Sequence, residues 1–249
     1  MNPRLWSLFA SLVLSVSWST TVTGETVIAF WDFNTPYDFP NDSAQIVHDA
    51  AIGSGTLFQQ RGDIDGNGKG GVLFDDSNLG INVPDGRAMA WDDIAKSGDN
   101  DAEFFIVVAT EGMKDIQIRF DLQGNGDPGT EITSYDLKYD LDPLEDVTVT
   151  DVNGTIKDFQ DGTSITVFNN QPLNANGDSF ISHSIDLSAI TALNNQGTVA
   201  FRFDDFEQND SMRIDNILVT GVTAIPEPSF AGALFLVGGL AACRRQRRT

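Results

Sequence analysis

A short acidic loop offers the clearest metal-ligand spacing in this sequence. The stretch DIDGNGKGG places oxygen-bearing side chains at alternate positions, as in the first half of a calcium-binding loop: Asp63, Asp65 and Asn67. Gly68 stands at the sixth position, where such a loop requires glycine, but the twelfth position holds Phe74 instead of a bidentate glutamate. The same residue types also suit an ordinary Asp/Gly turn. The loop therefore has two interpretations, a calcium site or a plain turn.

Residues for nucleophilic or acid–base catalysis are sparse. The two histidines, His48 and His183, do not stand in a pattern with a nucleophile or with metal ligands. The single cysteine, Cys243, excludes an intrachain disulfide. Carboxylate pairs occur in any chain with 36 acidic residues, so a glycosidase dyad has no specific support. We predict a non-enzymatic protein without catalytic residues, and we keep a secreted polysaccharide-acting hydrolase as the alternative.

Aromatic side chains could stack on sugar rings. Trp31 and Phe33 alternate along the first expected strand, 26–34, so we predict that both pack in the core. Trp91 lies in the loop-like stretch AMAWDDIAKSG. It is our candidate for an exposed, ligand-binding platform.

Short strands separated by turns are expected throughout residues 25–223. The segment 115–122, DIQIRFDL, alternates apolar and polar residues as a half-buried strand does. Other strands are predicted at the following ranges: 103–109, 134–141, 146–152, 164–168, 180–187, 198–206 and 213–222. A helix is expected only over 188–195, and residues 36–100 fit no strand pattern and suggest an elaborated loop region. We predict an all-β, antiparallel β-sandwich of the jelly-roll type.

Both ends of the chain have the layout of targeting segments. Residues 1–24 combine Arg4, an apolar stretch and small polar residues, which is typical of a signal peptide. Residues 230–243 carry no charge and would span roughly 21 Å as a helix, short of the ~30 Å hydrocarbon core. A basic cluster that would stay on the cytoplasmic side follows: Arg244, Arg245, Arg247 and Arg248. We predict a short, marginal transmembrane helix.

The order of elements over 224–249 resembles the PEP-CTERM sorting signal, also labelled an ice-binding protein C-terminal motif. The elements are the motif Pro226, Glu227 and Pro228, the apolar helix and the basic tail at 244–248. The resemblance implies that exosortase recognises the motif and removes the tail, after signal peptidase has cleaved the other end. It also implies transient residence in the inner membrane, followed by release to the cell surface or the extracellular space.

The central domain is similar to a bacterial extracellular β-sandwich module, reminiscent of galactose-binding-like and carbohydrate-binding jelly rolls. The similarity rests on WDFN at 31–34, on 116–141 and on 185–222, which contains RIDNILVTGV. In calcium-containing jelly rolls of this type an ion ties the first strand to the last, which implies Asp32, Asn34 and Asp215 as ligands. Asp215 lies in an otherwise apolar strand, where an unpaired carboxylate is costly. Alternatively, it faces solvent or caps a turn.

The charge distribution narrows the choice of partners. The net charge is −21, and the acidic residues, 29 Asp and 7 Glu, all lie within 25–227. Such a surface repels nucleic acid phosphates and attracts cations. We therefore predict no nucleic acid partner, and Ca²⁺ as a structural cofactor. The expected function is a structural or adhesive role in the cell envelope or extracellular matrix, with weak binding to exopolysaccharide.

Overall fold

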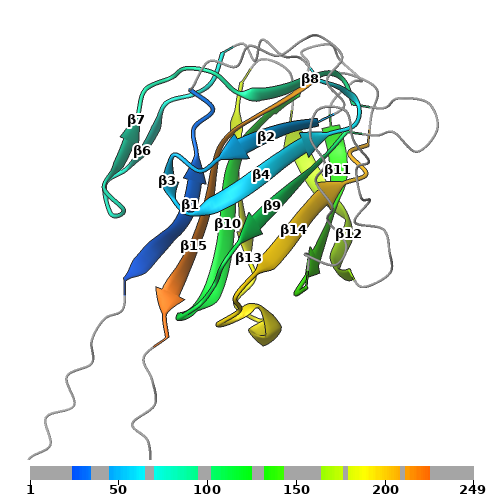
Figure 1. Cartoon of the computed structure of the whole chain (residues 1–249). Coiled ribbons are helices and arrows are strands. Elements are labelled where there is room, and N and C mark those ends of the chain that lie inside the picture. Colours follow the sequence, from blue (N-terminus) through cyan, green and yellow to red (C-terminus); the bar gives the residue numbers. More distant parts are fainter. Residues whose placement is uncertain are drawn as a thin grey trace, which may run out of the picture.

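The structure is a computed structural model, and the ranges it describes are 24–34, 45–64, 70–94, 102–124, 132–142, 164–175, 179–207 and 211–224 (Figure 1). Within them the chain forms antiparallel strands and one 3₁₀ turn, which confirms the predicted all-β class. No helix in these ranges is long and apolar enough to cross a membrane. The predicted signal peptide, sorting motif, membrane helix and basic tail lie outside the described residues, apart from Gly24 and Ala224 at their inner borders.

Two antiparallel sheets make up the domain. Sheet A has the order β13 (Ile181–Asp186), β10 (Met113–Gly124), β15 (Met212–Thr223), β1 (Glu25–Trp31) and β3 (Ile52–Gly53). The start of β15 also pairs with β8 (Met89–Asp93), which in turn pairs with β5 (Asp63–Ile64). Sheet B has the order β12 (Ile165–Ala175), β11 (Ile132–Asp140), β14 (Val199–Asp204), β9 (Glu103–Val108), β4 (Gly55–Gln60) and β2 (Gln45–Asp49). Outside the two sheets are the hairpin β6 (Phe74–Asp76) and β7 (Ile81–Val83), and the 3₁₀ turn η1 (Thr191–Leu193).

The core lies between the inner faces of the two sheets. Strand β10 follows its sequence pattern and buries alternate residues: Ile116, Ile118, Phe120 and Leu122. Sheet B contributes Phe104 and Phe203, whose rings stack with centroids 4.5 Å apart. Trp31 and Phe33 are 1% and 2% exposed, so their predicted place in the core is confirmed. Because side chains of both sheets share one cluster, strand alternation sets which residues reach the outer faces.

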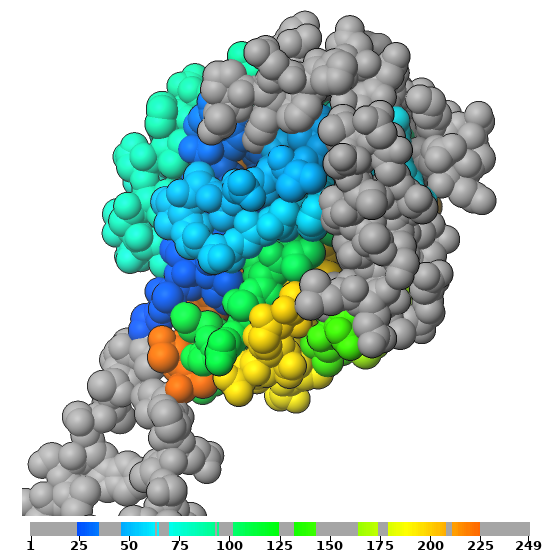
Figure 2. Space-filling view, viewed as in Figure 1, coloured from blue at the N-terminus to red at the C-terminus, as the bar shows by residue number. Residues whose placement is uncertain are grey.

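The β6–β7 hairpin covers part of the outer face of sheet A. Ile81 and Phe74 pack there against Phe30 and Leu218 in a small cluster that is separate from the main core. Figure 2 shows the residues of the hairpin, in blue-green, at the edge of the molecule beside the blue residues of β1. An ion pair of 2.9 Å between Asp76 and Arg119 of β10 holds the hairpin to the sheet. The chain on either side of the hairpin therefore also lies over this outer face.

The structure corrects two expectations about individual elements. Residues 36–100 are not a loop region, because β2 to β8 all lie within them and β4 is an interior strand of sheet B. Their short runs, interrupted by glycine and asparagine, gave no clear period. The predicted helix at 188–195 is only the single turn η1. The predicted strand at 146–152 lies outside the described residues.

Strand β1 begins and strand β15 ends at the same end of the sandwich. Glu25 of β1 pairs with Val222 of β15, and Ala224 donates a backbone hydrogen bond to Gly112 (Figure 1). At the opposite end β15 begins next to β8, where Met212 pairs with Trp91. We call the end with Glu25 and Ala224 the near end and the end with Met212 the far end.

Candidate metal centre

An irregularity in β15 brings an aspartate to the outer face of sheet A. Ile214 and Ile217 both face the core although two residues separate them, so the usual alternation is interrupted. Asn216, between them, has a positive φ of 51°, which asparagine adopts more readily than most residues. The interruption turns Asp215 away from the core. In register with it on the neighbouring strand β10 is Asp121.

Asp215 is enclosed although it lies on an outer face. It is 1% exposed, and its two carboxylate oxygens accept backbone hydrogen bonds of 2.8 Å, from Asn216 and from Val72. Val72 belongs to the segment that precedes the hairpin. A Cβ at Gly71 would collide with Oδ2 of Asp215, so the close approach of this segment requires glycine. The alternative of a solvent-facing Asp215 is wrong.

Asn216 connects Asp121 to the segment that precedes the hairpin. Its Nδ2 donates to Oδ2 of Asp121 at 2.9 Å and to the carbonyl oxygen of Val72 at 2.9 Å. The other oxygen of Asp121 accepts a hydrogen bond from the Ser182 hydroxyl of β13. Asp121 is 7% exposed, so a second carboxylate is buried beside Asp215.

Asp32 and Asn34 follow directly after β1 and approach the same place. Oδ1 of Asp32 accepts the backbone N–H of Asn34 at 3.2 Å. Oδ1 of Asn34 accepts the backbone N–H of Arg87 at 2.9 Å, in the chain that follows the hairpin. The three predicted ligands therefore lie in one region. However, the Asn34 oxygen that was predicted to bind the metal accepts a hydrogen bond from the chain that follows the hairpin.

Three carboxylates, Asp32, Asp121 and Asp215, make up what we call the sheet-A cluster. The pKa of Asp215 is raised to about 7, mainly by burial and to a smaller extent by the negative charges of Asp121 and Asp32, while the hydrogen bonds from the two backbone N–H groups act in the opposite direction. Within the described ranges, no lysine, arginine or histidine forms an ion pair with any of the three. Their oxygens do not all lie within 4.8 Å of one another, so an ion here would also need backbone oxygens or a turn of Asp32.

Trp91 does not form the predicted exposed platform. It is 0% exposed, because β8 pairs with β15 and the ring faces the core. There it packs against Phe104, with the two ring centroids 6.5 Å apart. Its Nε1 donates to the carbonyl oxygen of Arg61 at 3.0 Å. Strand β8 was not recognised in the sequence, so the burial of this tryptophan was missed with it.

The predicted calcium loop stays untested. The backbone of Asp63 pairs with Asp93 in the short strand β5, whereas Asp65 and Asn67 lie outside the described residues.

The two histidines serve packing. Nε2 of His48 lies 3.2 Å from Oε1 of Gln59, and burial lowers the pKa of His48 to about 4. His183 stacks on Phe120 with ring centroids 5.3 Å apart, and burial lowers its pKa as well.

Asp121 is the member of the cluster that was not identified from the sequence. Its strand was predicted correctly, with Asp121 on the polar side together with Gln117 and Arg119. Only the order of the strands in sheet A places it opposite Asp215. That order depends on contacts between residues about 95 positions apart, such as Asn216 and Asp121.

Comparisons with known proteins find similarity in structure alone. No protein-family model matches this chain, and no curated protein matches its sequence. A cleaved adhesin domain of Lys-gingipain from Porphyromonas gingivalis is 13% identical, with 76% of this chain and 95% of that chain covered and a TM-score of 0.32. TmCBM27, a carbohydrate-binding module with specific mannan recognition, is 9% identical, with coverages of 80% and 99% and a TM-score of 0.35. The enzymatically active domain of tailspike protein 4 of bacteriophage CBA120 is 12% identical, with coverages of 68% and 19% and a TM-score of 0.33. Similarities at this level assign neither a family nor a ligand to this chain.

Proposed function

We propose that this chain is an exported, non-enzymatic module of the cell envelope or extracellular matrix, a jelly roll stabilised by calcium, with a structural or adhesive role. The observation that carries the proposal is the buried charge of Asp121 and Asp215 in the sheet-A cluster, which no ion pair within the described residues compensates. Leaving carboxylates out of water without a partner costs several kcal/mol per charge. A Ca²⁺ ion supplies the missing positive charge through oxygen ligands.

The position of the cluster fits such a role. It joins β1, β10 and β15, so an ion there connects the first and the last strand of the domain. The chain has no disulfide to do this, since it contains one cysteine. Extracellular modules bind calcium with dissociation constants of about 10⁻⁴ to 10⁻³ M, which suits the concentration outside cells.

The arrangement of the two ends supports an adhesive function. Strand β1 begins and strand β15 ends at the near end (Figure 1). The acidic cluster lies toward the far end, because Asp215 is close to the start of β15 and pairs there with Asp121. A module held by its C-terminal sorting segment would present the far end to the surroundings. We propose exosortase and signal peptidase as processing partners and exopolysaccharide as the weakly bound ligand.

The direct test of the adhesive role is affinity electrophoresis of the exported protein in gels that contain exopolysaccharide from the producing cells. We expect retardation with millimolar calcium and little retardation after chelation. Equal mobility with and without polysaccharide, in the presence of calcium, would rule out glycan binding.

The sorting proposal has a separate test, the intact mass of protein recovered from the envelope and the medium. A mass that runs from Glu25 to a residue near Pro228 supports both processing steps. A mass that includes Arg244 to Thr249 contradicts removal of the tail.

A further inference from the structure

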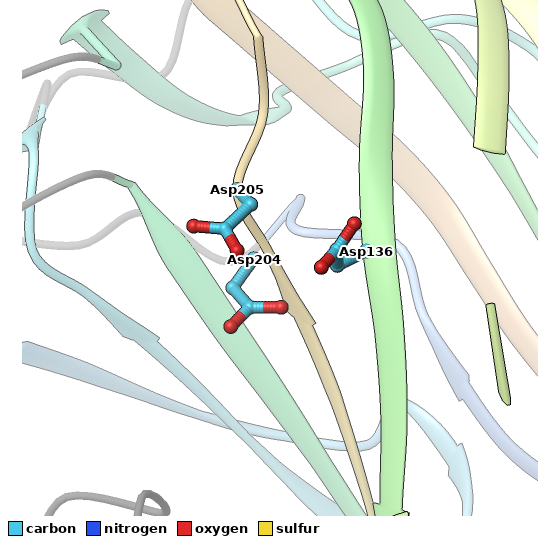
Figure 3. Close-up of side chains that lie close together, drawn as sticks. All are labelled: Asp136, Asp204 and Asp205. Atoms are coloured by element: carbon cyan, nitrogen blue, oxygen red, sulfur yellow. The ribbon is translucent and has the colours of Figure 1, made fainter. Parts of the chain in front are cut away.

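A second acidic cluster lies on the outer face of sheet B. Asp136 of β11 is in register with Asp204 of β14, and Asp205 follows directly. One carboxylate oxygen of each residue lies within 4.8 Å of the others, and within the described residues this is the only such group of three acidic, histidine or cysteine side chains. Figure 3 shows the three carboxylates turned toward one another. We call them the sheet-B triad.

Asp204 has one satisfied and one unsatisfied oxygen. Its Oδ2 accepts a hydrogen bond from Nζ of Lys138 at 2.9 Å and forms an ion pair with Nε of Arg202 at 3.0 Å. The residue is 4% exposed, and within the described residues its buried Oδ1 has no hydrogen-bond partner. A buried acceptor without a partner loses its hydration and gains nothing in return. An oxygen of this kind, buried and without a partner, is suited to binding a cation.

An open pocket of about 420 Å³ adjoins the triad. Its lining is dominated by carboxylates and amides: Asp136, Asn169, Asn170, Asp205, Phe206 and Glu207. The backbone N–H of Asn170 donates to Oδ1 of Asp136 at 2.7 Å, which fixes that carboxylate at the pocket wall. Asn169, Asn170 and Glu207 are exposed, so further oxygen ligands and water have room beside the triad.

We propose that Asp136, Asp205 and Oδ1 of Asp204 bind a calcium ion, with the remaining coordination positions facing the pocket. The donors are all oxygens, which calcium prefers and of which it takes six to eight. Lys138 and Arg202 offset two of the three negative charges, so the affinity is low. We expect a dissociation constant of about 10⁻³ M, at the weak end of the range for extracellular modules. This site is independent of the sheet-A cluster and does not require it.

The same carboxylates are poorly placed for hydrolysis of a glycosidic bond. A catalytic acid must contact the oxygen of the scissile bond. The free oxygen of Asp204 is buried, and the other is held by Lys138 and Arg202. A small ion can contact the buried oxygen of Asp204 from between the three side chains, whereas a polysaccharide is too large to reach it.

The test is a calorimetric titration of the chelator-treated full-length protein with CaCl₂. All titrations are made in an Asp215→Asn background, which removes the principal ligand of the sheet-A cluster. The test variant is Asp205→Asn, because Asp205 is exposed and its loss leaves the buried charges in place. The matched control is Asp49→Asn, an exposed aspartate on β2 of the same sheet.

We expect the background protein and the control to bind one calcium ion with equal affinity, and Asp205→Asn to weaken that binding at least tenfold. Identical titrations for Asp205→Asn and Asp49→Asn, or no binding in the background protein, would overturn the site. Either failure leaves the sheet-A cluster untouched, because that cluster is tested by comparing the unsubstituted protein with Asp215→Asn. Urea denaturation of each variant verifies that the fold is retained.

Discussion

The two acidic clusters differ in where their balancing charge comes from. In the sheet-A cluster the buried carboxylates receive backbone N–H and amide hydrogen bonds, and no ion pair within the described residues balances them. In the sheet-B triad Asp204 has Arg202 and Lys138 as partners, and Arg202 also contacts Glu103 at 2.6 Å. We propose that the first arrangement takes its balancing charge from a cation outside the protein. The second is largely balanced within the protein, and an ion there would act locally.

The largest expected effect comes from removing the internal balance of sheet B. Arg202 is 3% exposed, between Glu103 and Asp204, which are 1% and 4% exposed. Arg202→Met leaves both carboxylates buried without this partner, and breaking a buried pair in this way costs about 3 to 5 kcal/mol. We expect a lower urea midpoint with an unchanged slope.

The control for this prediction is Arg213→Met on β15. Arg213 is partly buried next to the sheet-A cluster and its Nη1 donates to Gln123 at 3.3 Å, so we expect a loss below about 1 kcal/mol. If the two substitutions had equal effects, the internal charge balance of sheet B would not matter for stability.

Calcium removal should affect mainly the sheet-A cluster. For a dissociation constant of about 10⁻⁴ M in the sheet-A cluster, calcium at about 10 mM is present at 100 times this constant and stabilises the folded state by about 2.7 kcal/mol, which corresponds to roughly 5 to 10 °C in Tm for a domain of this size. We expect chelation to lower the Tm of the unsubstituted protein by this amount, and Asp215→Asn to abolish most of the difference. Differential scanning calorimetry with and without chelator measures it. If Asp205→Asn abolished the shift instead, the stabilising ion would be in sheet B.

The two clusters were not equally predictable from the sequence, because they are encoded over different distances along the chain. Asp215 was identifiable because a charged residue interrupts an apolar strand, which is a local pattern. The sheet-B triad was not, since Asp136 and Asp204 become neighbours only when β11 pairs with β14, and alternating acidic residues are common in this chain. The prediction for Trp91 was wrong for a related reason. The exposure of Trp91 depends on whether β8 pairs with β15, and a strand of five residues is too short to indicate its partner strand from its sequence.

The fold class was predictable because the longer strands carry their own pattern. Strands β10, β14 and β15 bury alternate or consecutive apolar residues over 6 to 12 positions. The short strands β2 to β8 contain too few residues for a period to emerge, so the pairing of β4 with β9 could not be foreseen.

A pH effect would separate the clusters further in calcium-free protein. The pKa of Asp215 is raised to about 7 in the folded state, from an ordinary value near 3.8. Between these two pH values the folded protein binds more protons at Asp215 than the unfolded protein does. The contribution of Asp215 to the free energy of unfolding therefore falls as the pH rises, by about 1.4 kcal/mol per pH unit. Asp215→Asn removes this contribution. We expect the variant to gain stability relative to the unsubstituted protein between pH 4 and pH 7.

The effect is measured as the difference in free energy of unfolding between the unsubstituted protein and Asp215→Asn, because His48 changes stability with pH in the opposite direction. Its pKa is lowered to about 4 from 6.5, so its contribution to stability rises with pH over that window. The contribution is the same in both proteins and cancels. Urea denaturation at half-unit pH steps gives the difference, and a flat line would mean that Asp215 ionises as an exposed aspartate does.

The smallest expected effect on stability is that of Lys138→Gln, and it is the most informative about the triad. Lys138 is partly exposed, so its pair with Asp204 contributes no more than about 1 kcal/mol to folding. Its charge nevertheless repels any cation bound at Asp204, so we expect calcium to bind the triad of this variant about three- to tenfold more tightly in the Asp215→Asn background. Lys114→Gln, which removes an exposed pair with Asp115 at 3.7 Å on sheet A, serves as control and should leave the affinity unchanged. Only an ion close to Asp204 responds to Lys138 and not to Lys114. If both substitutions changed the affinity equally, the ion would be held by the overall charge of the protein and not by the sheet-B triad.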